Sequence, residues 1–198
     1  MSVAVVNLGV GNTASMMFAL ERLGADAVLT REPRVIAEAE RVVLPGVGAA
    51  GYAMGRLDAL GLTPVLKAFE RPLLGVCLGQ QLLYEASDEG DAIGLGRIPG
   101  RVTRLAPAPD RPAPHMGWNR LSLVRSDPLL EGVDDGAYVY FVHGYVCPFE
   151  APTLACTTYG EAFSSVVRQG QAWGCQFHPE RSSRTGARIL RNFLALPC

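Results

Sequence analysis

The chain has 198 residues, of which 48% are hydrophobic, and its 18 basic and 19 acidic residues leave a formal net charge of −1. A chain of this size can bury a full core without metals or disulfides, so we expect one domain over residues 1–198. The balanced charge argues against the basic surface that binds nucleic acid or an anionic membrane. Small molecules or another protein are therefore the expected partners.

The five cysteines are odd in number and irregularly spaced, so a disulfide framework is not expected and a reducing cytoplasm fits better. The amino terminus lacks a basic segment, and Asn7 and Gly9 interrupt its apolar run, which argues against a signal peptide. No segment is long and apolar enough to span a bilayer. These features predict a soluble, cytoplasmic protein.

Short apolar runs alternate with helical patterns through the first half of the chain. A helix over 13–24 presents one apolar face, formed by Met16, Met17, Leu20 and Leu23. The apolar runs lack a period of two, which is typical of parallel strands covered on both faces. We expect strands at 3–6, 26–30, 42–45 and 73–76, and further helices around 33–40, 51–60, 63–70 and 78–86.

The stretch LLGVCLG, residues 73–79, places Cys77 where the fourth strand gives way to a helix. The pattern G-x-C-x-G has the form of a nucleophile elbow, in which Gly75 and Gly79 let strand and helix approach closely. The start of the helix favours a thiolate, and the N–H of Leu78 can donate to a developing oxyanion. The alternative is a buried structural cysteine, since free cysteine is among the most buried residue types.

The second half of the chain is rich in β-strand patterns. Short apolar runs separated by Gly, Pro and Asp turns over about 97–177 predict hairpins or an antiparallel extension of the sheet. Four prolines make 105–114 an exposed loop. An amphipathic helix over 182–196 closes the chain, and Ser182 or Ser183 can cap it.

A thiol nucleophile needs a base, and the chain has three histidines, His115, His143 and His178. His178 ends an apolar run, and Pro179 holds it outside the helical region. Glu180 follows two residues later, close enough to orient the imidazole and fix its tautomer. His178 is therefore the preferred base, with Glu180 as its orienting carboxylate.

A zinc site is the competing interpretation of the same region. Its ligands would be Cys175 and His178, with Cys147, Cys156 and His143 near them in sequence. Because no paired C-x-x-C or H-x-x-x-H spacing supports that site, we expect no metal and no cofactor.

GVCLGQQLL, followed about a hundred residues later by FHPE, strongly resembles the class I (triad) glutamine amidotransferases. The resemblance implies a flavodoxin-like three-layer α/β fold with a mostly parallel central sheet and an antiparallel extension. It implies that Cys77 attacks the glutamine carboxamide, that His178 is general base and acid, and that Glu180 orients His178.

Four further stretches resemble the glutaminase subunits of imidazole glycerol phosphate synthase in histidine biosynthesis. They are VVLPGVGAAGYAM (42–54), NLGVGNTASM (7–16), PHMGWNRL (114–121) and VYFVHGY (139–145). This resemblance implies a heterodimer with a cyclase subunit. The ammonia released from L-glutamine would pass through a channel to that subunit, which converts PRFAR to imidazole glycerol phosphate and AICAR.

The resemblance also suggests residues for the oxyanion, the substrate and the partner. Glycines would let an N–H near Val47 rotate toward the oxyanion, and Gln81 would bind the amino-acid end of glutamine unless it is an exposed helix residue. Trp118 lies in an expected Gly-Trp-Asn turn, and interfaces favour tryptophan. The oxyanion and substrate set is Gly46, Val47, Gly48, Leu78, Gln81, His143, Gly144 and Tyr145. The partner set is Asn12, Met116, Trp118, Asn119 and Arg181.

Three residues depart from the usual pattern of these subunits. Asn7 stands where many relatives have Asp, Gly144 replaces a common Ser, and Arg181 replaces a Lys. Arginine can keep an ion pair made by that lysine with altered geometry. Two alternatives stay open: another class I glutaminase or stand-alone thiol hydrolase, and a non-catalytic docking module of the same fold.

Overall fold

The computed structural model describes residues 2–9, 13–109 and 111–198. Asn12, one of the candidate partner residues, lies outside the described residues. No helix within these ranges is long and apolar enough to cross a membrane.

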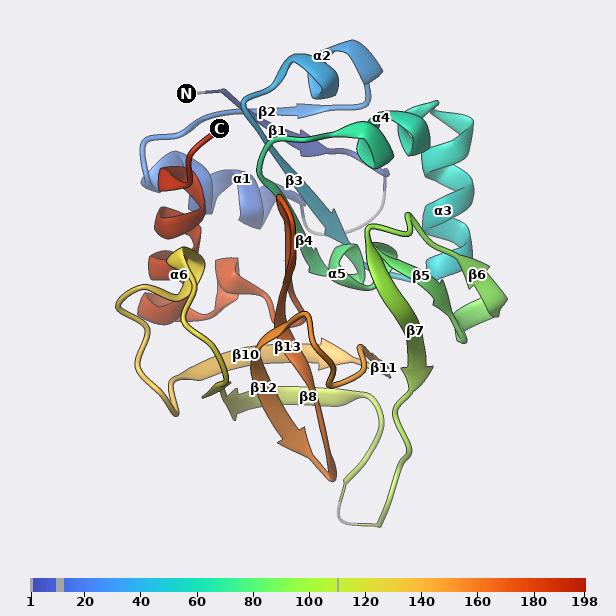
Figure 1. The fold of residues 1–198 in the computed structure, drawn as a ribbon, viewed down its shortest axis with the longest axis vertical. Helices are drawn as coiled ribbons and strands as arrows, with labels where there is room; N and C mark the ends of the chain where they lie inside the picture. Colours follow the sequence, from blue (N-terminus) through green and yellow to red (C-terminus); the bar gives the residue numbers. More distant parts are fainter. Residues whose placement is uncertain (1, 10–12, 110) are drawn as a thin grey trace.

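The core of the fold is one twisted sheet, which in the described part of the chain has eight strands in the order β2-β1-β3-β4-β14-β13-β12-β9 (Figure 1). Neighbouring strands run parallel from β2 to β14, and β13, β12 and β9 extend the sheet with antiparallel pairing. The expected parallel sheet with an antiparallel extension is confirmed. The strands are β1 (Ser2–Val6), β2 (Asp26–Thr30), β3 (Arg41–Gly46), β4 (Leu73–Cys77), β9 (Ser122–Leu123), β12 (Thr153–Tyr159), β13 (Glu161–Gln169) and β14 (Ala172–Cys175).

Helices cover both faces of this sheet, which gives three layers (Figure 1). Helix α1 (Thr13–Arg22) and α6 (Ser183–Ala195) pack on one face. Helices α2 (Pro33–Glu38), α3 (Ala50–Ala59) and α4 (Leu62–Ala68) pack on the other. The inner strands β1, β3 and β4 are buried on both sides, whereas the edge strand β2 is mostly exposed and departs from the prediction of full coverage.

The described residues also form two smaller sheets beside the main one. Strand β8 (His115–Arg120) pairs antiparallel with β10 (Tyr138–His143). Trp118 therefore lies in a strand, opposite Tyr140, and the prediction of a Gly-Trp-Asn turn is wrong. The second small sheet has the order β11-β7-β5-β6. Its strands are β11 (Tyr145–Val146), β7 (Ile98–Arg104), β5 (Tyr84–Ser87) and β6 (Ala92–Ile93).

The helix predicted over 78–86 is shorter in the structure. Helix α5 spans Leu78–Leu82 and gives way at once to β5. Its last carbonyl groups accept hydrogen bonds from amides of the 95–98 segment, including Leu95 N to Leu82 O at 2.7 Å and Ile98 N to Leu83 O at 2.9 Å. Another segment of the chain therefore takes the acceptors that a longer helix would use.

Within the described ranges, three short 3₁₀ helices complete the fold: η1 (Glu89–Asp91), η2 (Pro128–Leu130) and η3 (Pro179–Arg181). Ser182 holds the N-cap position of α6, but its hydroxyl makes no cap bond; it donates to His178 O at 2.7 Å and accepts from Tyr140 N at 2.9 Å. The predicted side-chain cap is therefore wrong at Ser182.

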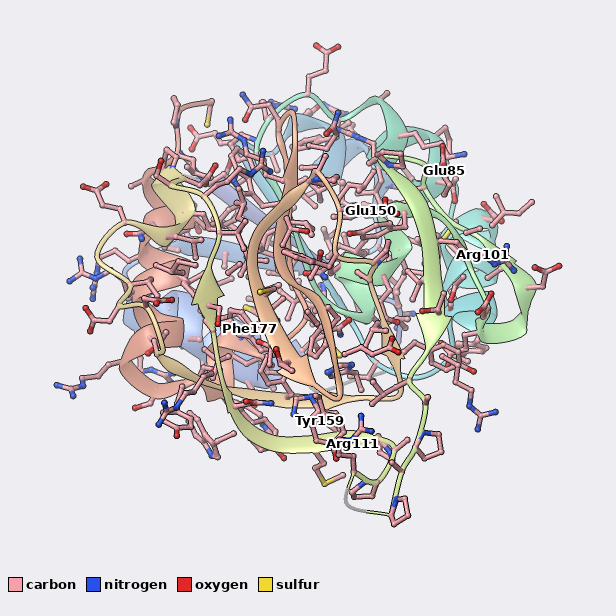
Figure 2. The ribbon with its side chains drawn as sticks, turned by 60° about the horizontal axis from the view of Figure 1, so that its bottom comes forward. Glu85, Arg101, Arg111, Glu150, Tyr159 and Phe177 are labelled. Carbon is pink, nitrogen blue, oxygen red and sulfur yellow. The ribbon has the colours of Figure 1, made fainter. Side chains whose placement is uncertain are left out.

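The described residues of the proline-rich segment 105–114 form a largely exposed loop, as predicted. It folds back against the end of β12, where Figure 2 shows Arg111 next to Tyr159. The Tyr159 hydroxyl donates to the carbonyl of Pro112 at 2.8 Å.

Candidate active site

Cys77 forms a sharp turn between β4 and α5. Its φ is +55° and its ψ is −111°, a conformation that L residues rarely adopt. The two glycines allow the turn, because a Cβ at Gly75 would lie 2.5 Å from the Gly79 carbonyl oxygen and one at Gly79 would lie 1.8 Å from the Leu44 carbonyl oxygen. Helix α5 thus lies in direct backbone contact with β4 and with the neighbouring strand β3, as an elbow requires.

His178 lies at the start of η3, across a cavity from the elbow. Its backbone N–H donates to Tyr140 O at 2.9 Å, and Ser182 holds its carbonyl, so β10 and α6 together fix the turn. The imidazole Nδ1 meets the Glu180 carboxylate at 2.8 Å, and both side chains are buried. Because a carboxylate only accepts, Nδ1 carries the proton there and Nε2 is the atom left for chemistry.

The environment of His178 favours its charged form. Burial by itself lowers the pKa of His178, but the neighbouring Cys77 sulfur and the Glu180 carboxylate outweigh burial and raise it to about 10. Among the described residues, no hydrogen bond reaches the buried Nε2 atom. The charged imidazole therefore keeps one nitrogen, Nε2, available for proton transfer.

Cys77 and His178 line one cavity of about 370 Å³. All eight of the expected oxyanion and substrate residues also line it. Pro45, Gly46, Val47 and Gly48 come from the end of β3, and Leu78 and Gln81 come from α5. His143, Gly144 and Tyr145 come from the β10–β11 region, and Glu180 and Arg181 come from η3.

The two glycines of the 45–48 loop have different roles. Gly48 has φ +91°, so it needs the backbone freedom expected of it. Gly46 has no positive φ and is buried, and a Cβ there would lie 3.0 Å from both the Gly79 nitrogen and the Leu78 Cβ. Gly46 is therefore required for close packing on α5 rather than for rotation.

Gln81 is 5% exposed, which contradicts the exposed-helix alternative. Its Nε2 donates to Tyr145 O and to Gln176 Oε1, both at 3.0 Å. Tyr145 O also accepts the Nδ1 proton of His143 at 2.8 Å. The Tyr145 carbonyl and the buried Gln176 side chain thus hold the side chain of Gln81 at the cavity wall.

His143 lines the cavity as a buried, neutral side chain. Its Nε2 meets Nδ1 of His115 at 3.1 Å, and the Nε2 of His115 meets Nδ2 of Asn119 at 3.3 Å. Burial lowers the pKa of His143 to about 3 and that of His115 to about 4. Both rings therefore stay uncharged near pH 7.

Two polar residues at this site are not evident from the sequence motifs. Glu89 in η1 lines the cavity and accepts a hydrogen bond from Ala50 N at 2.7 Å, at the start of α3. Gln176 is fully buried, and its Nε2 lies 3.9 Å from Cys77 Sγ. The available signal for Gln176 was a polar amide inside the apolar run that leads to His178.

The candidate partner residues fall into two groups. Met116 and Trp118 project from β8 and are 64% and 52% exposed, a pattern typical of an interface. Asn119 instead turns inward, toward His115 and Thr158 O. Arg181 is exposed at the cavity rim, with its guanidinium 6.0 Å from the centre of the Tyr140 ring.

The cysteine and histidine set proposed for zinc does not converge. Across the described ranges, no three His, Cys, Asp or Glu side chains lie together as a metal site would need. Cys175 is fully buried in the apolar core between the sheet and the layer of α1 and α6, where burial raises the pKa of its thiol.

Comparisons with known proteins agree with this geometry. Residues 4–196 match the family described as "Glutamine amidotransferase class-I". The chain is 50% identical over 194 residues to imidazole glycerol phosphate synthase subunit HisH of Xylella fastidiosa, and 51% identical over 194 residues to the subunit of that name in Xanthomonas axonopodis pv. citri. Each alignment covers 98% of this chain and 97% of the relative.

Solved structures share the fold. A crystal structure described as a glutamine amidotransferase is similar with a TM-score of 0.75 at 22% identity, over 98% of this chain and 97% of that one. The glutaminase domain of Trypanosoma brucei CTPS, solved with bound acivicin, is similar with a TM-score of 0.69 at 14% identity, over 100% and 95% of the two chains. At these identities the likeness bears on the fold alone.

Proposed function

The chain belongs to the class I glutamine amidotransferases, and we infer that it is the glutaminase subunit of an imidazole glycerol phosphate synthase. Identity of about one half over almost the full length of such subunits supports this assignment. The observation that carries the chemistry is the strained Cys77 turn facing a histidine whose other nitrogen is held by Glu180 at 2.8 Å. We place the enzyme in the cytoplasm, where its five free cysteines would stay reduced.

In the proposed reaction the Cys77 thiolate attacks the side-chain carbonyl carbon of L-glutamine. The carbonyl electron pair moves to oxygen, where N–H groups at Val47 and Leu78 stabilise it. His178 gives its Nε2 proton to the nitrogen as the C–N bond breaks, so ammonia departs and a γ-glutamyl thioester remains. Water then attacks the thioester, His178 takes its proton, and glutamate leaves as the thiolate is restored.

Residues around the cavity account for the recognition of an amino acid. The Glu89 carboxylate suits the α-ammonium group of glutamine, because charge-assisted hydrogen bonds are the strong ones. The side-chain NH₂ group of Gln81 donates to Tyr145 O, so the side-chain oxygen of Gln81 points away from that carbonyl. This oxygen can accept a hydrogen bond from a donor of the substrate. Gly144 has no side chain to contribute, so any contact there comes from its backbone.

The ammonia serves a cyclase partner, which converts PRFAR to imidazole glycerol phosphate and AICAR. We propose that the partner covers the β8 surface formed by Met116 and Trp118 and the nearby Arg181. Large exposed apolar side chains next to a cation form the kind of surface that association buries. Asn12 is also proposed for this contact from the sequence resemblance.

The test is glutamate release from L-glutamine by the purified chain, alone and with a cyclase subunit plus its ribulose phosphate ligand. We expect low basal release that rises by orders of magnitude with the liganded partner and vanishes in Cys77→Ala. Full activity of the chain alone would favour a stand-alone thiol hydrolase. No activity under any condition would leave only the docking module.

A further inference from the structure

The amide of Gln176 lies between a substrate residue and the reacting sulfur. Gln176 follows the last residue of β14, its side chain is fully buried, and its backbone N–H donates to Ser165 O at 2.9 Å. One end of its side-chain amide meets Gln81, and the other meets Cys77 Sγ. A buried amide is costly unless both ends find partners, and here the second partner is the nucleophile.

Neighbouring groups determine which end of the amide faces the sulfur. Tyr145 O can only accept, so the atom of Gln81 that meets it must be the NH₂ group. That same NH₂ group reaches Gln176 at 3.0 Å, and therefore the atom of Gln176 at that end must be its oxygen. The NH₂ group of Gln176 is consequently the end that points at Cys77.

The sulfur has different partners in its two protonation states. A thiol can donate to Val142 O, which lies 3.6 Å from Sγ. A thiolate has no proton to give, and the partial negative charge of that carbonyl repels it. The N–H of Gln176 at 3.9 Å attracts the thiolate and interacts only weakly with the thiol.

We propose that Gln176 is a further residue of the catalytic site, whose amide N–H holds the Cys77 sulfur as a thiolate while Gln81 fixes the orientation of that amide. This inference rests on the proposed glutaminase function and deepens it. It joins substrate recognition to the nucleophile, because Gln81 borders the substrate cavity and orients Gln176 in one hydrogen-bonded chain. His178 supplies the opposing charge to the thiolate, and Gln176 supplies a neutral donor to the same sulfur.

Other titratable and charged groups line the same cavity as Cys77 or lie close to this cysteine. They come from η3 and the residue before it, from η1, from β10 and from the chain after β11, so a single variant must be judged against all of them. They are His178, Glu180, Arg181, Glu89, His143 and Cys147.

The experiment measures the reactivity of Cys77 with iodoacetamide from pH 5 to pH 10, followed by mass spectrometry of the Cys77 peptide. Gln176→Met removes the donor at nearly constant volume. Gln176→Glu keeps an acceptor for Gln81 and places a carboxyl group at the sulfur. Gln80→Met is the matched control, since Gln80 is equally buried and donates to Ser164 O at 3.0 Å instead of to Cys77.

We expect the pH of half-maximal alkylation to rise by about one unit in Gln176→Met, which is about a tenfold loss of thiolate at pH values well below that midpoint. The rise should be larger in Gln176→Glu and absent in Gln80→Met. With the cyclase partner, kcat for glutamate release should fall about tenfold in Gln176→Met, with KM for glutamine changed less than about threefold.

An unmoved alkylation profile in a folded Gln176 variant would overturn the proposal, and a raised KM with that profile would reduce Gln176 to a support for Gln81. Thermal unfolding identifies the folded variants, and Gln176→Glu carries the test if Gln176→Met does not fold. Alkylation needs no glutamine turnover. An inactive wild-type complex would therefore refute the proposed function while the alkylation result stands on its own.

Discussion

Gly79→Ala tests whether the backbone contact at the elbow is essential. A Cβ at position 79 would lie 1.8 Å from Leu44 O, and such contacts essentially never fall below 3.0 Å, so β3 and α5 would have to separate by about 1.2 Å. Overpacking costs about 1–3 kcal/mol, with the upper end expected here because the obstacle is backbone in the central sheet. Alanine returns about 1 kcal/mol through helix propensity. We expect a net loss of about 2 kcal/mol.

The same displacement should reach the chemistry. Cys77 is two residues before the substituted position, and a misplacement of about 1 Å can cost about 10²-fold in rate. Urea unfolding gives the free energy, and glutamate release in the complex with the cyclase subunit gives the rate. Gly55→Ala in α3 is the control, because Gly55 is exposed with nothing within 4 Å of its Cβ position. It should gain up to about 1 kcal/mol at unchanged activity.

The backbone contact at Gly79 is not essential if Gly79→Ala keeps its rate and stays within about 0.5 kcal/mol of wild-type stability, the usual range for surface substitutions. Loss of activity without loss of stability would indicate a local effect on Cys77 alone. A similar loss of stability and rate in Gly55→Ala would show that replacing any helical glycine has this effect, and that the loss is not specific to Gly79.

Three further outcomes are expected. Glu180→Gln should lower kcat for glutamate release by about 10²-fold with little change in KM, because the orienting carboxylate of His178 is lost; an unchanged kcat would remove Glu180 from the triad. Trp118→Ala should weaken cyclase binding by about 2 kcal/mol in calorimetric titration and leave thermal stability unchanged, since the indole is half exposed; an unchanged affinity would exclude Trp118 from the contact. Because the folded-state pKa of His115 is depressed to about 4, its contribution to stability is present above about pH 6.5 and lost as the pH falls toward 4. Between pH 7 and pH 5 the protonation of His115 in the unfolded chain lowers the free energy of unfolding by about 2 kcal/mol. This loss should be absent from urea unfolding of His115→Phe, which keeps an aromatic ring stacked on Tyr159. If the stability of His115→Phe falls as steeply with pH as that of wild type, other groups cause the loss.

Local pattern was sufficient to predict the parallel strands, the turn at Cys77 and the contact between His178 and Glu180. Apolar runs without a period of two predicted the inner strands, because a strand buried on both faces has no polar side to show. The elbow was predictable because a tight turn needs small residues at Gly75 and Gly79 whatever else surrounds it. His178 and Glu180 are neighbours in sequence, so their pairing at 2.8 Å followed from two residues of separation.

The sequence by itself therefore determined the elements and the residues whose partners are local. Only the tertiary structure decided where α5 ends, since amides of the 95–98 segment take its carbonyl groups. It also decided that Trp118 lies in a strand paired with Tyr140, and that Gln176 reaches Cys77 across 99 positions of sequence. The physical reason is that distant segments of the chain supply hydrogen-bond partners, burial and strand pairing, and a local sequence pattern does not show which distant segment will pack there.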